Sequence, residues 1–364
     1  MIIDLPWKGS ETPCAILDIL RGCNAKCAFC YNQDEPYFKP VDVVRAELDE
    51  LCRLRKLQAV MVSGGEPLLH PDVLEIVKMV KSKGLVAIIL TNGILLDSPF
   101  AAKLKAAGCE LCYLHIQAGQ SRPDMPDGAD WQTANRLLIE KSSVLVSSGI
   151  RAGCCITLPH TDSDGIKREC EAFFKNRNLS NILITTARSA DDFDKPSCSD
   201  MPIAELLNRF RSVGLVPFAS LSGKIDKKRR RWFSFQVVEA RFSDGRPVRR
   251  ISLRASYGEL FAMKLQRLFR GRHDFTLPPT SSAFLRIRLL LNAISGGKFL
   301  DSLKFAIDPR VVLSFRNVAL DIPPFRRDDG RIEFCEDCPG AVLKNGKLRP
   351  LCLSDIDLPE GFEI

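Results

Sequence analysis

The strongest constraint on the fold is a regular alternation of short apolar runs and longer helical patterns in the first 215 residues. The apolar runs expected to be strands are residues 15–20, 58–62, 85–90, 111–116, 151–157 and 181–186. The expected helices are residues 41–57, 71–83, 99–107, 131–148, 165–175 and 202–213. Repeated βα units build parallel sheets. We therefore predict an α/β fold in which residues 12–214 form a partial (β/α)6 TIM-like barrel.

Glycines, polar residues and cysteines follow the expected strands, at the carboxyl ends where βα barrels place their chemistry. After the first strand come Cys23, Cys27 and Cys30, with the spacing Cys-x3-Cys-x2-Cys. A closed structural zinc site needs four protein ligands, so three thiolates are one too few. A four-iron cluster held by three cysteines keeps one iron open for another ligand. A zinc loop with a distant fourth ligand is the alternative.

The second expected strand ends in Ser63-Gly64-Gly65-Glu66-Pro67. Together with the three cysteines, this motif resembles the radical S-adenosylmethionine (radical SAM) superfamily. The resemblance implies that the cysteines hold a [4Fe-4S] cluster whose open iron chelates S-adenosylmethionine. It further implies that Phe29 packs near the adenine. Gly64 and Gly65 would let backbone groups approach the methionine moiety, and Glu66 would accept a hydrogen bond from its ammonium group.

Later strand ends are expected to complete the cofactor pocket. Thr91 and Asn92 match a Thr-Asn-Gly that many superfamily members carry near the ribose. The fourth strand ends in His115-Ile116-Gln117, where many relatives have Ser and Asp. Gln117 is therefore a candidate for the ribose hydroxyls, and His115 is a candidate catalytic residue facing the substrate. Arg188, just past the sixth strand, is a candidate partner for the methionine carboxylate or for an anionic substrate group.

A second cysteine group consists of Cys335, Cys338 and Cys352, with the spacing Cys-x2-Cys-x13-Cys. It resembles the carboxyl-terminal cluster motif of the molybdenum cofactor biosynthesis A protein and of SPASM and twitch domains. The resemblance implies a second [4Fe-4S] cluster, folded over the barrel mouth. Asn345-Gly346 is a tight-turn signal for a hairpin that returns Cys352 to the other two cysteines. A zinc site closed by a fourth ligand such as Cys198 is the alternative.

From residue 215 the regular alternation of expected strands and helices ends. Residues 231–242 and 246–255, joined through Ser243-Asp244-Gly245, predict a β-hairpin. Residues 257–269 and 281–295 predict amphipathic helices with many arginines. We expect these helices to pack on the barrel with their arginines turned to water; binding to a membrane or a lipid-like ligand is the alternative. The expected regions are 215–330, the hairpin and helices, and 331–364, an α+β segment around the second cluster.

Composition limits the remaining functional classes. The 364-residue chain has a net charge of +8, partly from the run Lys227-Lys228-Arg229-Arg230-Arg231. This run lacks regularly interleaved aromatic residues, so nucleic-acid binding is not the expected function. Fourteen cysteines, two groups of them at metal-ligand spacing, fit a reducing compartment. With neither a signal-peptide pattern nor an apolar run of transmembrane length, the sequence predicts a cytoplasmic protein.

The predicted function is reductive cleavage of S-adenosylmethionine to a 5′-deoxyadenosyl radical that removes a hydrogen atom from a substrate. A flavodoxin- or ferredoxin-type electron donor is the implied partner. A peptide, a lipid-like molecule and a nucleotide all remain open as substrates. The alternatives are a radical SAM methyltransferase, and a noncatalytic iron-sulfur or zinc protein that binds nucleic acid.

Overall fold

A computed structural model describes most of the chain: residues 2–27, 30, 37–158, 164–186, 203–242, 248–276, 282–294 and 298–354. Three residues with an expected role, Phe29, Arg188 and Cys198, lie outside this part, as does the expected turn at residues 243–245.

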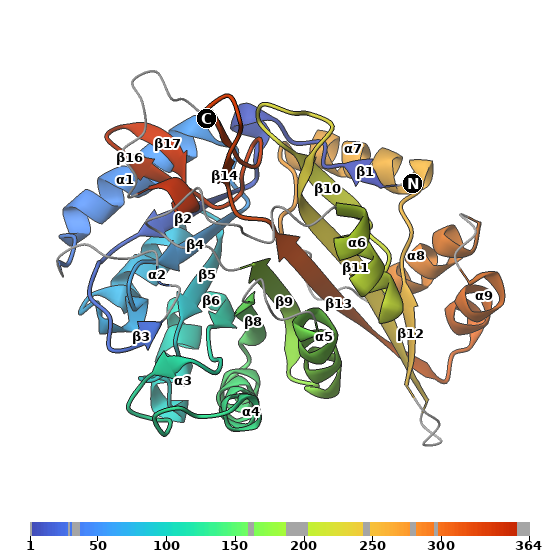
Figure 1. The fold of residues 1–364 in the computed structure, drawn as a ribbon, viewed down its shortest axis with the longest axis horizontal. Helices are drawn as coiled ribbons and strands as arrows, with labels where there is room; N and C mark the ends of the chain where they lie inside the picture. Colours follow the sequence, from blue (N-terminus) through green and yellow to red (C-terminus); the bar gives the residue numbers. More distant parts are fainter. Residues whose placement is uncertain are drawn as a thin grey trace.

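The six expected strands are present as parallel neighbours in one sheet (Figure 1). They are β2 (Cys14–Asp18), β4 (Ala59–Ser63), β5 (Val86–Thr91), β6 (Cys109–Leu114), β8 (Arg151–Leu158) and β9 (Leu179–Thr186). The helices between them are α1 (Val41–Leu54), α2 (Val73–Ser82), α3 (Ser98–Ala107), α4 (Trp131–Ser147), α5 (Gly165–Lys175) and α6 (Ile203–Ser212). The predicted partial (β/α)6 architecture is confirmed.

The caps and the buried faces of these helices follow from their sequences. Asp97 caps α3 by accepting a 2.7 Å hydrogen bond from the backbone N–H of Phe100, and Asp130 caps α4 in the same way. In α1 the buried residues are Val44, Leu48 and Leu51, spaced at three and four residues. Such apolar faces, together with the strands, form the largest core of the molecule.

The sheet does not stop at β9 but continues into a second wall. Its strands are β13 (Val311–Asp321), β11 (Arg230–Phe242), β12 (Arg249–Ser252), β10 (Ala219–Ser222) and β1 (Ile3–Asp4). Within the described residues the sheet has eleven strands, with β13 parallel to β9 and β11 antiparallel to β13. The expected pairing of 231–242 with 246–255 is confirmed as β11 and β12, although β12 is shorter. The sequence analysis did not find β13.

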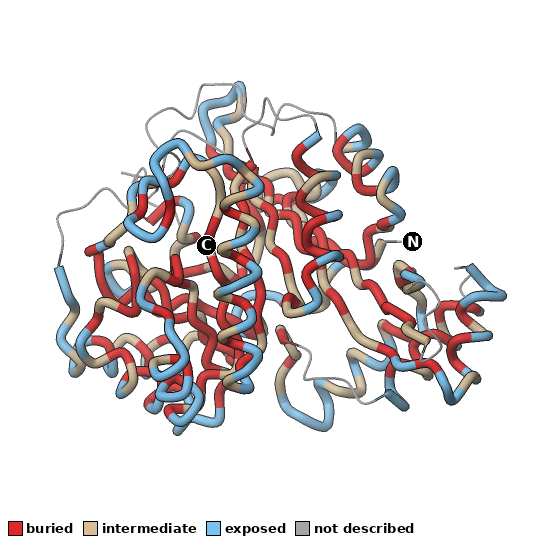
Figure 2. Tube along the Cα trace, turned by 90° about the horizontal axis from the view of Figure 1, so that it is seen from below, coloured by how far each residue is buried: buried red, intermediate tan, exposed pale blue. Residues whose placement is uncertain are grey.

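Three helices lie on this second wall: α7 (Tyr257–Arg270), α8 (Ser282–Ile294) and α9 (Phe299–Ile307). The prediction that the first two bury their apolar faces and expose their arginines holds only in part. In α7, Arg267 and Arg270 are exposed as predicted, but the apolar Phe261 and Leu268 are exposed as well. In α8, Leu285 and Leu289 are buried as predicted, but Arg288 is buried too. Figure 2 shows how much of this part of the chain is exposed. No helix of the described part is long and apolar enough to cross a membrane.

The carboxyl-terminal segment forms two small hairpins. Strands β14 (Phe325–Arg326) and β15 (Ile332–Glu333) make one, and β16 (Ala341–Lys344) and β17 (Lys347–Pro350) make the other. Asn345 and Gly346 have φ angles of 52° and 73°, which confirms the predicted tight turn. The second hairpin packs beside the edge strand β2. It thereby covers an edge that would otherwise expose unpaired backbone groups.

Candidate functional site

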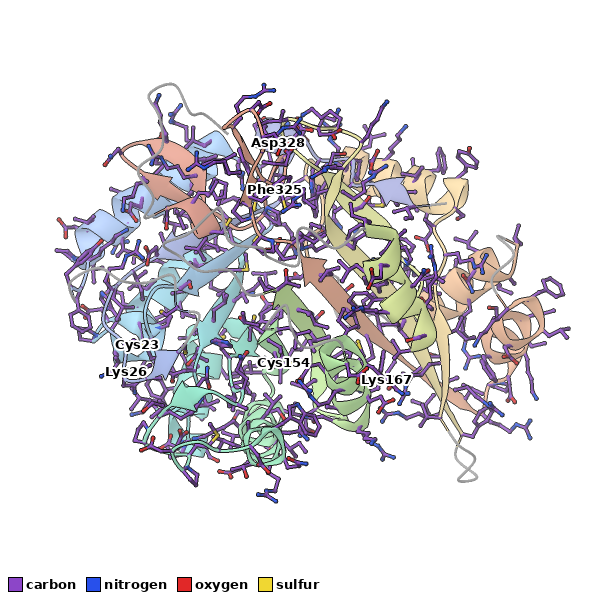
Figure 3. The ribbon with its side chains drawn as sticks, viewed as in Figure 1. Cys23, Lys26, Cys154, Lys167, Phe325 and Asp328 are labelled. Atoms are coloured by element: carbon purple, nitrogen blue, oxygen red, sulfur yellow. The ribbon has the colours of Figure 1, made fainter. Side chains whose placement is uncertain are left out.

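The first cysteine loop leaves the carboxyl end of β2 and lines a cavity of about 1290 Å³ with Cys23, Cys27 and Cys30. Cys27 ends the short strand β3 (Lys26–Cys27), which pairs with β7 (Gln120–Ser121). In Figure 3, Cys23 and Lys26 lie together beside the sheet. The three predicted ligands of the first cluster therefore open onto one space.

Two side-chain amides donate hydrogen bonds to the sulfurs of this loop. Asn92 Nδ2 lies 3.7 Å from Cys23 Sγ, and Gln120 Nε2 lies 3.3 Å from Cys27 Sγ. Burial raises the pKa of the Cys23 thiol, and it raises that of Cys27 to about 11. A metal ligand must be a thiolate, and N–H donors aimed at sulfur favour that form. The surroundings of Cys23 and Cys27 therefore suit sulfurs whose negative charge is balanced by a metal centre.

Gly64 and Gly65 bring the end of β4 against the cysteine loop. The backbone N–H of Gly65 donates to Leu20 O at 2.9 Å, and that of Glu66 donates to Gly22 O at 2.8 Å. Gly64 has a φ of 147°, and a Cβ on it would lie 2.4 Å from Leu20 O. Only glycine fits this approach. Both glycines line the cavity, as expected for residues that present backbone to a ligand.

Glu66 is not among the residues that line the cavity, and its hydrogen bond with the ammonium group stays a prediction. Its side chain is fully buried, with 0% exposed. One carboxylate oxygen accepts from Thr91 Oγ1 at 2.6 Å and from the Leu68 N–H at 2.9 Å, and the other accepts from the Asn92 N–H at 2.6 Å. Glu66 therefore ties the loop after β4 to the loop after β5.

Thr91 and Asn92 both line the cavity, near the place expected for a cofactor pocket. Their side chains also connect the loops. The Thr91 hydroxyl accepts from the Gly93 N–H at 2.9 Å while donating to Glu66, and Asn92 Nδ2 donates to Asn24 Oδ1 at 2.8 Å. Their contact with a ribose stays a prediction.

His115 also lines the cavity, whereas Gln117 is used by the protein itself. Gln117 Oε1 accepts from the Thr157 N–H at 2.7 Å, and its Nε2 donates to Thr157 O at 3.1 Å. This bidentate pair joins the ends of β6 and β8. Gln117 is not among the residues that line the cavity, and its contact with ribose hydroxyls stays a prediction.

A chain of hydrogen bonds leads from Gln117 through His115 to the cysteine loop. His115 Nε2 lies 3.2 Å from Gln117 Oε1, and its Nδ1 lies 3.4 Å from Gln120 Nε2, which also contacts Cys27. These contacts assign the proton to Nε2. Burial lowers the pKa of His115, so the imidazole is neutral near pH 7.

The loop at residues 118–130 is joined to the cysteine loop by the pairing of β7 with β3. Arg122 is 4% exposed and contacts Gln120 Oε1 at 3.1 Å, Asn92 O at 2.8 Å and Asp124. The sequence analysis missed Gln120 and Arg122, because they lie in a loop without a recognisable motif. The available signal in the sequence was that Gln120 is a polar residue directly after a glycine, Gly119.

Cys338 of the second cysteine group lies at the other end of β2. Arg55 Nη1 donates to the carbonyl of Cys14, the first residue of β2, at 2.7 Å and to that of Cys338 at 3.0 Å. Cys23 follows the opposite end of the same strand, whose length alone is roughly 13 Å. Cys338 therefore lies beside the start of β2, whereas Cys335 lies beside Asp321 at the carboxyl end of β13. The expected place of a second cluster over the barrel mouth stays a prediction. Cys338 and Cys352 nevertheless line the same cavity as the first loop.

Cys335 is buried next to charged groups that the sequence analysis did not find. Its sulfur lies 3.8 Å from Asp321 Oδ1, at the end of β13. Burial raises the pKa of Asp321 to about 6, and the nearby guanidinium of Arg231 opposes that shift. Arg231 donates to the carbonyls of Ile322 and Pro323. Figure 3 shows Phe325, whose ring lies under this guanidinium at 4.8 Å, above the sheet.

The donor sets fit iron-sulfur clusters better than single metal ions. In the described part of the chain, no three His, Cys, Asp or Glu side chains are close enough to hold one ion. A cubane cluster spaces its cysteine ligands more widely than one zinc ion does. Three thiols facing one cavity, two of them bonded by amides, match that requirement for the first loop. For the second group, Cys338 and Cys352 line the same cavity, and Cys335 lies buried beside Asp321.

Comparison with known proteins bears on the part of the chain that carries the first cysteine group. Residues 17–138 match the model of the Radical SAM superfamily, so this part of the chain is similar to that superfamily. The cofactors of that superfamily are S-adenosylmethionine and a [4Fe-4S] cluster, which agrees with the resemblance drawn from the motifs.

The curated relatives of the radical SAM segment are enzymes with different products. Fe-coproporphyrin III synthase of Methanosarcina barkeri is 32% identical over 108 residues, covering 29% of this chain and 27% of that protein. GTP 3',8-cyclase of Chlorobaculum tepidum is 35% identical over 92 residues, covering 24% of this chain and 28% of that protein. The chain thus matches under a third of the length of these relatives.

Among solved structures, Streptococcus suis SuiB bound to S-adenosylmethionine aligns with a TM-score of 0.42 and 16% identity. The alignment covers 56% of this chain and 47% of that chain.

Proposed function

We propose that this chain is a radical SAM enzyme that removes a hydrogen atom from a substrate held between two iron-sulfur clusters. S-adenosylmethionine, reduced at the first cluster, would supply the 5′-deoxyadenosyl radical. Cys23, Cys27 and Cys30 would hold the first [4Fe-4S] cluster, and Cys335, Cys338 and Cys352 the second. The observation that carries the proposal is that residues of both cysteine groups line one cavity of about 1290 Å³.

The residues around the first loop would prepare the site in two ways. The backbone of Gly64 and Gly65 offers polar groups to the methionine moiety at a place where no side chain intrudes. The buried Glu66 fixes the adjoining loops, so that Asn92 stays in reach of Cys23. A site held by such a network needs little rearrangement when its cofactor binds.

His115 is the candidate side chain for contact with the substrate. It faces the cavity, and its neutral imidazole is oriented by Gln117 and Gln120. With its Nε2 proton directed at Gln117, the imidazole would serve to orient a ligand rather than to donate a proton. An electron donor of the flavodoxin or ferredoxin type completes the proposal.

The alternative of nucleic-acid binding through Lys227 to Arg231 is not favoured, because the protein itself engages most of this run. Lys227 pairs with Glu336, and Arg230 pairs with Asp4. Arg231 is 2% exposed. Groups already paired or buried contribute little to phosphate binding.

Anaerobic reconstitution tests the proposal. We expect roughly eight irons per chain, and 5′-deoxyadenosine on adding dithionite and S-adenosylmethionine. Replacing Cys23, Cys27 and Cys30 by Ala should abolish 5′-deoxyadenosine formation. Replacing Cys335, Cys338 and Cys352 by Ala should remove about half of the iron but leave some cleavage.

Several outcomes would contradict the proposal. Zinc alone at both sites, or no 5′-deoxyadenosine from the iron-loaded protein, would exclude it. S-adenosylhomocysteine as the principal product would indicate a methyltransferase instead. Zinc at the second site with a working first cluster would restrict the proposal to one cluster.

A further inference from the structure

The cavity extends well beyond the two cysteine groups. On the second wall it is lined by residues of β11, β13, α7 and α8, including Phe284, Phe315 and Arg288, and by Phe218 just before β10. Apolar atoms form most of the lining of the whole cavity, and on this wall aromatic side chains alternate with polar ones such as Gln236 and Asn317. The cofactor has no assigned contact there. This region is therefore available to a substrate.

Arg288 is the outstanding polar group of this region. It is 4% exposed, and its guanidinium lies 5.3 Å and 5.5 Å from the ring centroids of Phe218 and Phe315. Its Nε donates to Glu259 Oε1 at 2.9 Å, and its Nη2 donates to Gln236 Oε1. These contacts hold the guanidinium in one orientation.

One end of this guanidinium is left unsatisfied. Nη1 is buried and has no hydrogen-bond partner in the described part of the chain. Other buried polar atoms without a partner also belong to residues lining the cavity, namely Trp7 Nε1, Thr186 Oγ1 and Ser314 Oγ. Buried polar groups in native proteins are nearly always bonded, and an orphan donor on a charged group is the costliest kind. A ligand that brings an acceptor would remove that cost.

We propose that Arg288 anchors the carboxylate of a substrate whose apolar body lies along the cavity between α7, α8 and β13. An arginine gives charge-assisted hydrogen bonds to a carboxylate, and the Phe218 and Phe315 rings shield them from water. The inference rests on the proposed function only in taking this ligand to be the substrate. The binding site itself does not require the radical chemistry.

Binding of dodecanoate and of dodecan-1-ol, measured by calorimetry on the reconstituted protein without reductant, tests the anchor. The wild type should bind dodecanoate more tightly than the alcohol. Arg288→Gln leaves Glu259 buried without its partner, so the informative variant is Arg288→Gln combined with Glu259→Gln. It should lose about ten- to a hundredfold of dodecanoate affinity and little affinity for the alcohol.

The exposed Arg254 supplies a matched control. Arg254→Gln removes the same charge and should bind both probes like the wild type. Equal dodecanoate affinity in the double variant and the wild type would overturn the anchor, as would a wild type that prefers the alcohol. Dodecanoate binding in a protein that forms no 5′-deoxyadenosine would support the anchor and refute the proposed function.

A second inference comes from the outer side of the same wall. Helix α7 turns Glu259, Met263 and Gln266 toward the cavity. Its apolar face points outward, where Tyr257 and Phe269 are 80% and 82% exposed. Large apolar side chains at this exposure on one helix mark an interaction surface.

The neighbouring helices continue this surface. Leu291 of α8 approaches Gly258 of α7, and α8 packs on α9. On these helices Ile294, Leu300 and Ile307 are 82%, 77% and 67% exposed. Residues 257–310 contain nine Lys and Arg but four Asp and Glu. Ion pairs already hold Arg267, Arg270, Arg288 and Arg310, whereas Lys264, Lys298 and Lys304 are exposed.

We infer that the outer face of α7, α8 and α9 lies on an anionic membrane surface. Aromatic and aliphatic side chains flanked by lysines and arginines are the composition of helices that bind in the lipid headgroup region. The occupant proposed is a bilayer rather than another protein, because the exposed Lys264, Lys298 and Lys304 match anionic lipid. A membrane position would also suit an apolar substrate carboxylate.

Co-sedimentation with vesicles tests this surface. The protein should bind phosphatidylglycerol vesicles at low salt and bind phosphatidylcholine vesicles at least tenfold more weakly. Phe261→Ser with Leu268→Ser should weaken binding at least tenfold. The control, Ile139→Ser with Val146→Ser on the exposed side of α4, should leave it unchanged. Equal binding of the α7 and α4 variants to phosphatidylglycerol vesicles would overturn the inference. A dimer that forms at any salt concentration, buries Phe261 and does not bind vesicles would also overturn it.

Discussion

The two cysteine groups border one cavity but are built in opposite ways. The first is a loop fixed by backbone and amide hydrogen bonds, with donors from Asn92 and Gln120 aimed at its sulfurs. The second contains a buried sulfur against the carboxyl group of Asp321, with Arg231 close by. Donors to a thiolate and a neighbouring carboxylate shift a cluster potential in opposite directions. The difference suggests separate roles, the first in electron transfer to S-adenosylmethionine and the second in holding the substrate.

The largest effect expected from a single change is at Gly64. Gly64→Ala would place a Cβ 2.4 Å from Leu20 O at a φ of 147°, so the end of β4 must move away from the cysteine loop. We expect loss of the first cluster and of S-adenosylmethionine binding, measured by iron content and calorimetry. Gly258→Ala, at a glycine of α7 without a positive φ and with only ordinary contacts around its Cβ position, is the control. A variant that keeps the first cluster and binds S-adenosylmethionine normally would contradict the assigned close approach.

Arg231 tests the second group. Arg231→Leu removes a buried guanidinium that binds the carbonyls of Ile322 and Pro323 and leaves Asp321 without a nearby cation. Removing one partner of a buried charged pair costs about 3–5 kcal/mol of folding stability. This destabilisation should be confined to the segment that carries the second cysteine group. The expected result is half of the iron lost with 5′-deoxyadenosine still formed. Loss of both clusters together would show that the two groups are not independent.

Gln120 tests the donors of the first group. Gln120→Leu removes the 3.3 Å hydrogen bond to Cys27 Sγ. A net hydrogen-bond energy of about 1 kcal/mol corresponds to roughly 40 mV for a one-electron couple. The potential of the first cluster should fall by about that amount in a redox titration followed by electron paramagnetic resonance. The reduction potential of the second cluster should not change. An unchanged potential of the first cluster would refute the role of Gln120.

The smallest effect expected is a pH dependence from two buried histidines, one near each part of the cavity. Burial lowers the pKa of both His115 and His273. The unfolded chain then takes up protons first, so stability is full above the unfolded pKa near 6.5 and falls as the pH drops below it. His115→Gln and His273→Gln should each make the free energy of unfolding, measured with urea, fall less steeply between pH 7 and pH 5. An unchanged slope in either variant would show that its histidine is not buried neutral.

Much of the first wall could be predicted because its signals are local. Each strand and helix of the βα rhythm carries its own apolar pattern, and Asn345-Gly346 specifies a turn within two residues. The cysteine and Gly-Gly motifs were recognisable for a similar reason, since their spacing along the chain reflects the ligand. Cys154 and Cys155 followed the alternation of a strand, with Cys155 facing the cavity and Cys154 in the core.

The expected ligand contacts of Glu66 and Gln117 stay predictions, because a polar side chain at a strand end can serve either the ligand or the neighbouring loop. Only the positions of Thr91, Asn92 and Thr157 decide between these uses. Cys109 and Cys112 make the same point inside a strand. A bulge in the pairing of β5 and β6 brings their buried sulfurs within 3.6 Å of each other, although three-residue spacing in a regular strand would separate them.

By itself the sequence determined the parallel βα wall, the three-cysteine loop and its Gly-Gly partner, because periodicity and motif spacing are properties of nearby residues. Tertiary structure alone decided that β13 and β11 extend the sheet, that both cysteine groups border one cavity and that Arg288 faces it with a free donor. It also decided that α7 turns its apolar side outward. An amphipathic pattern states that a helix has two faces, but only the packing of distant strands determines which of them is inside.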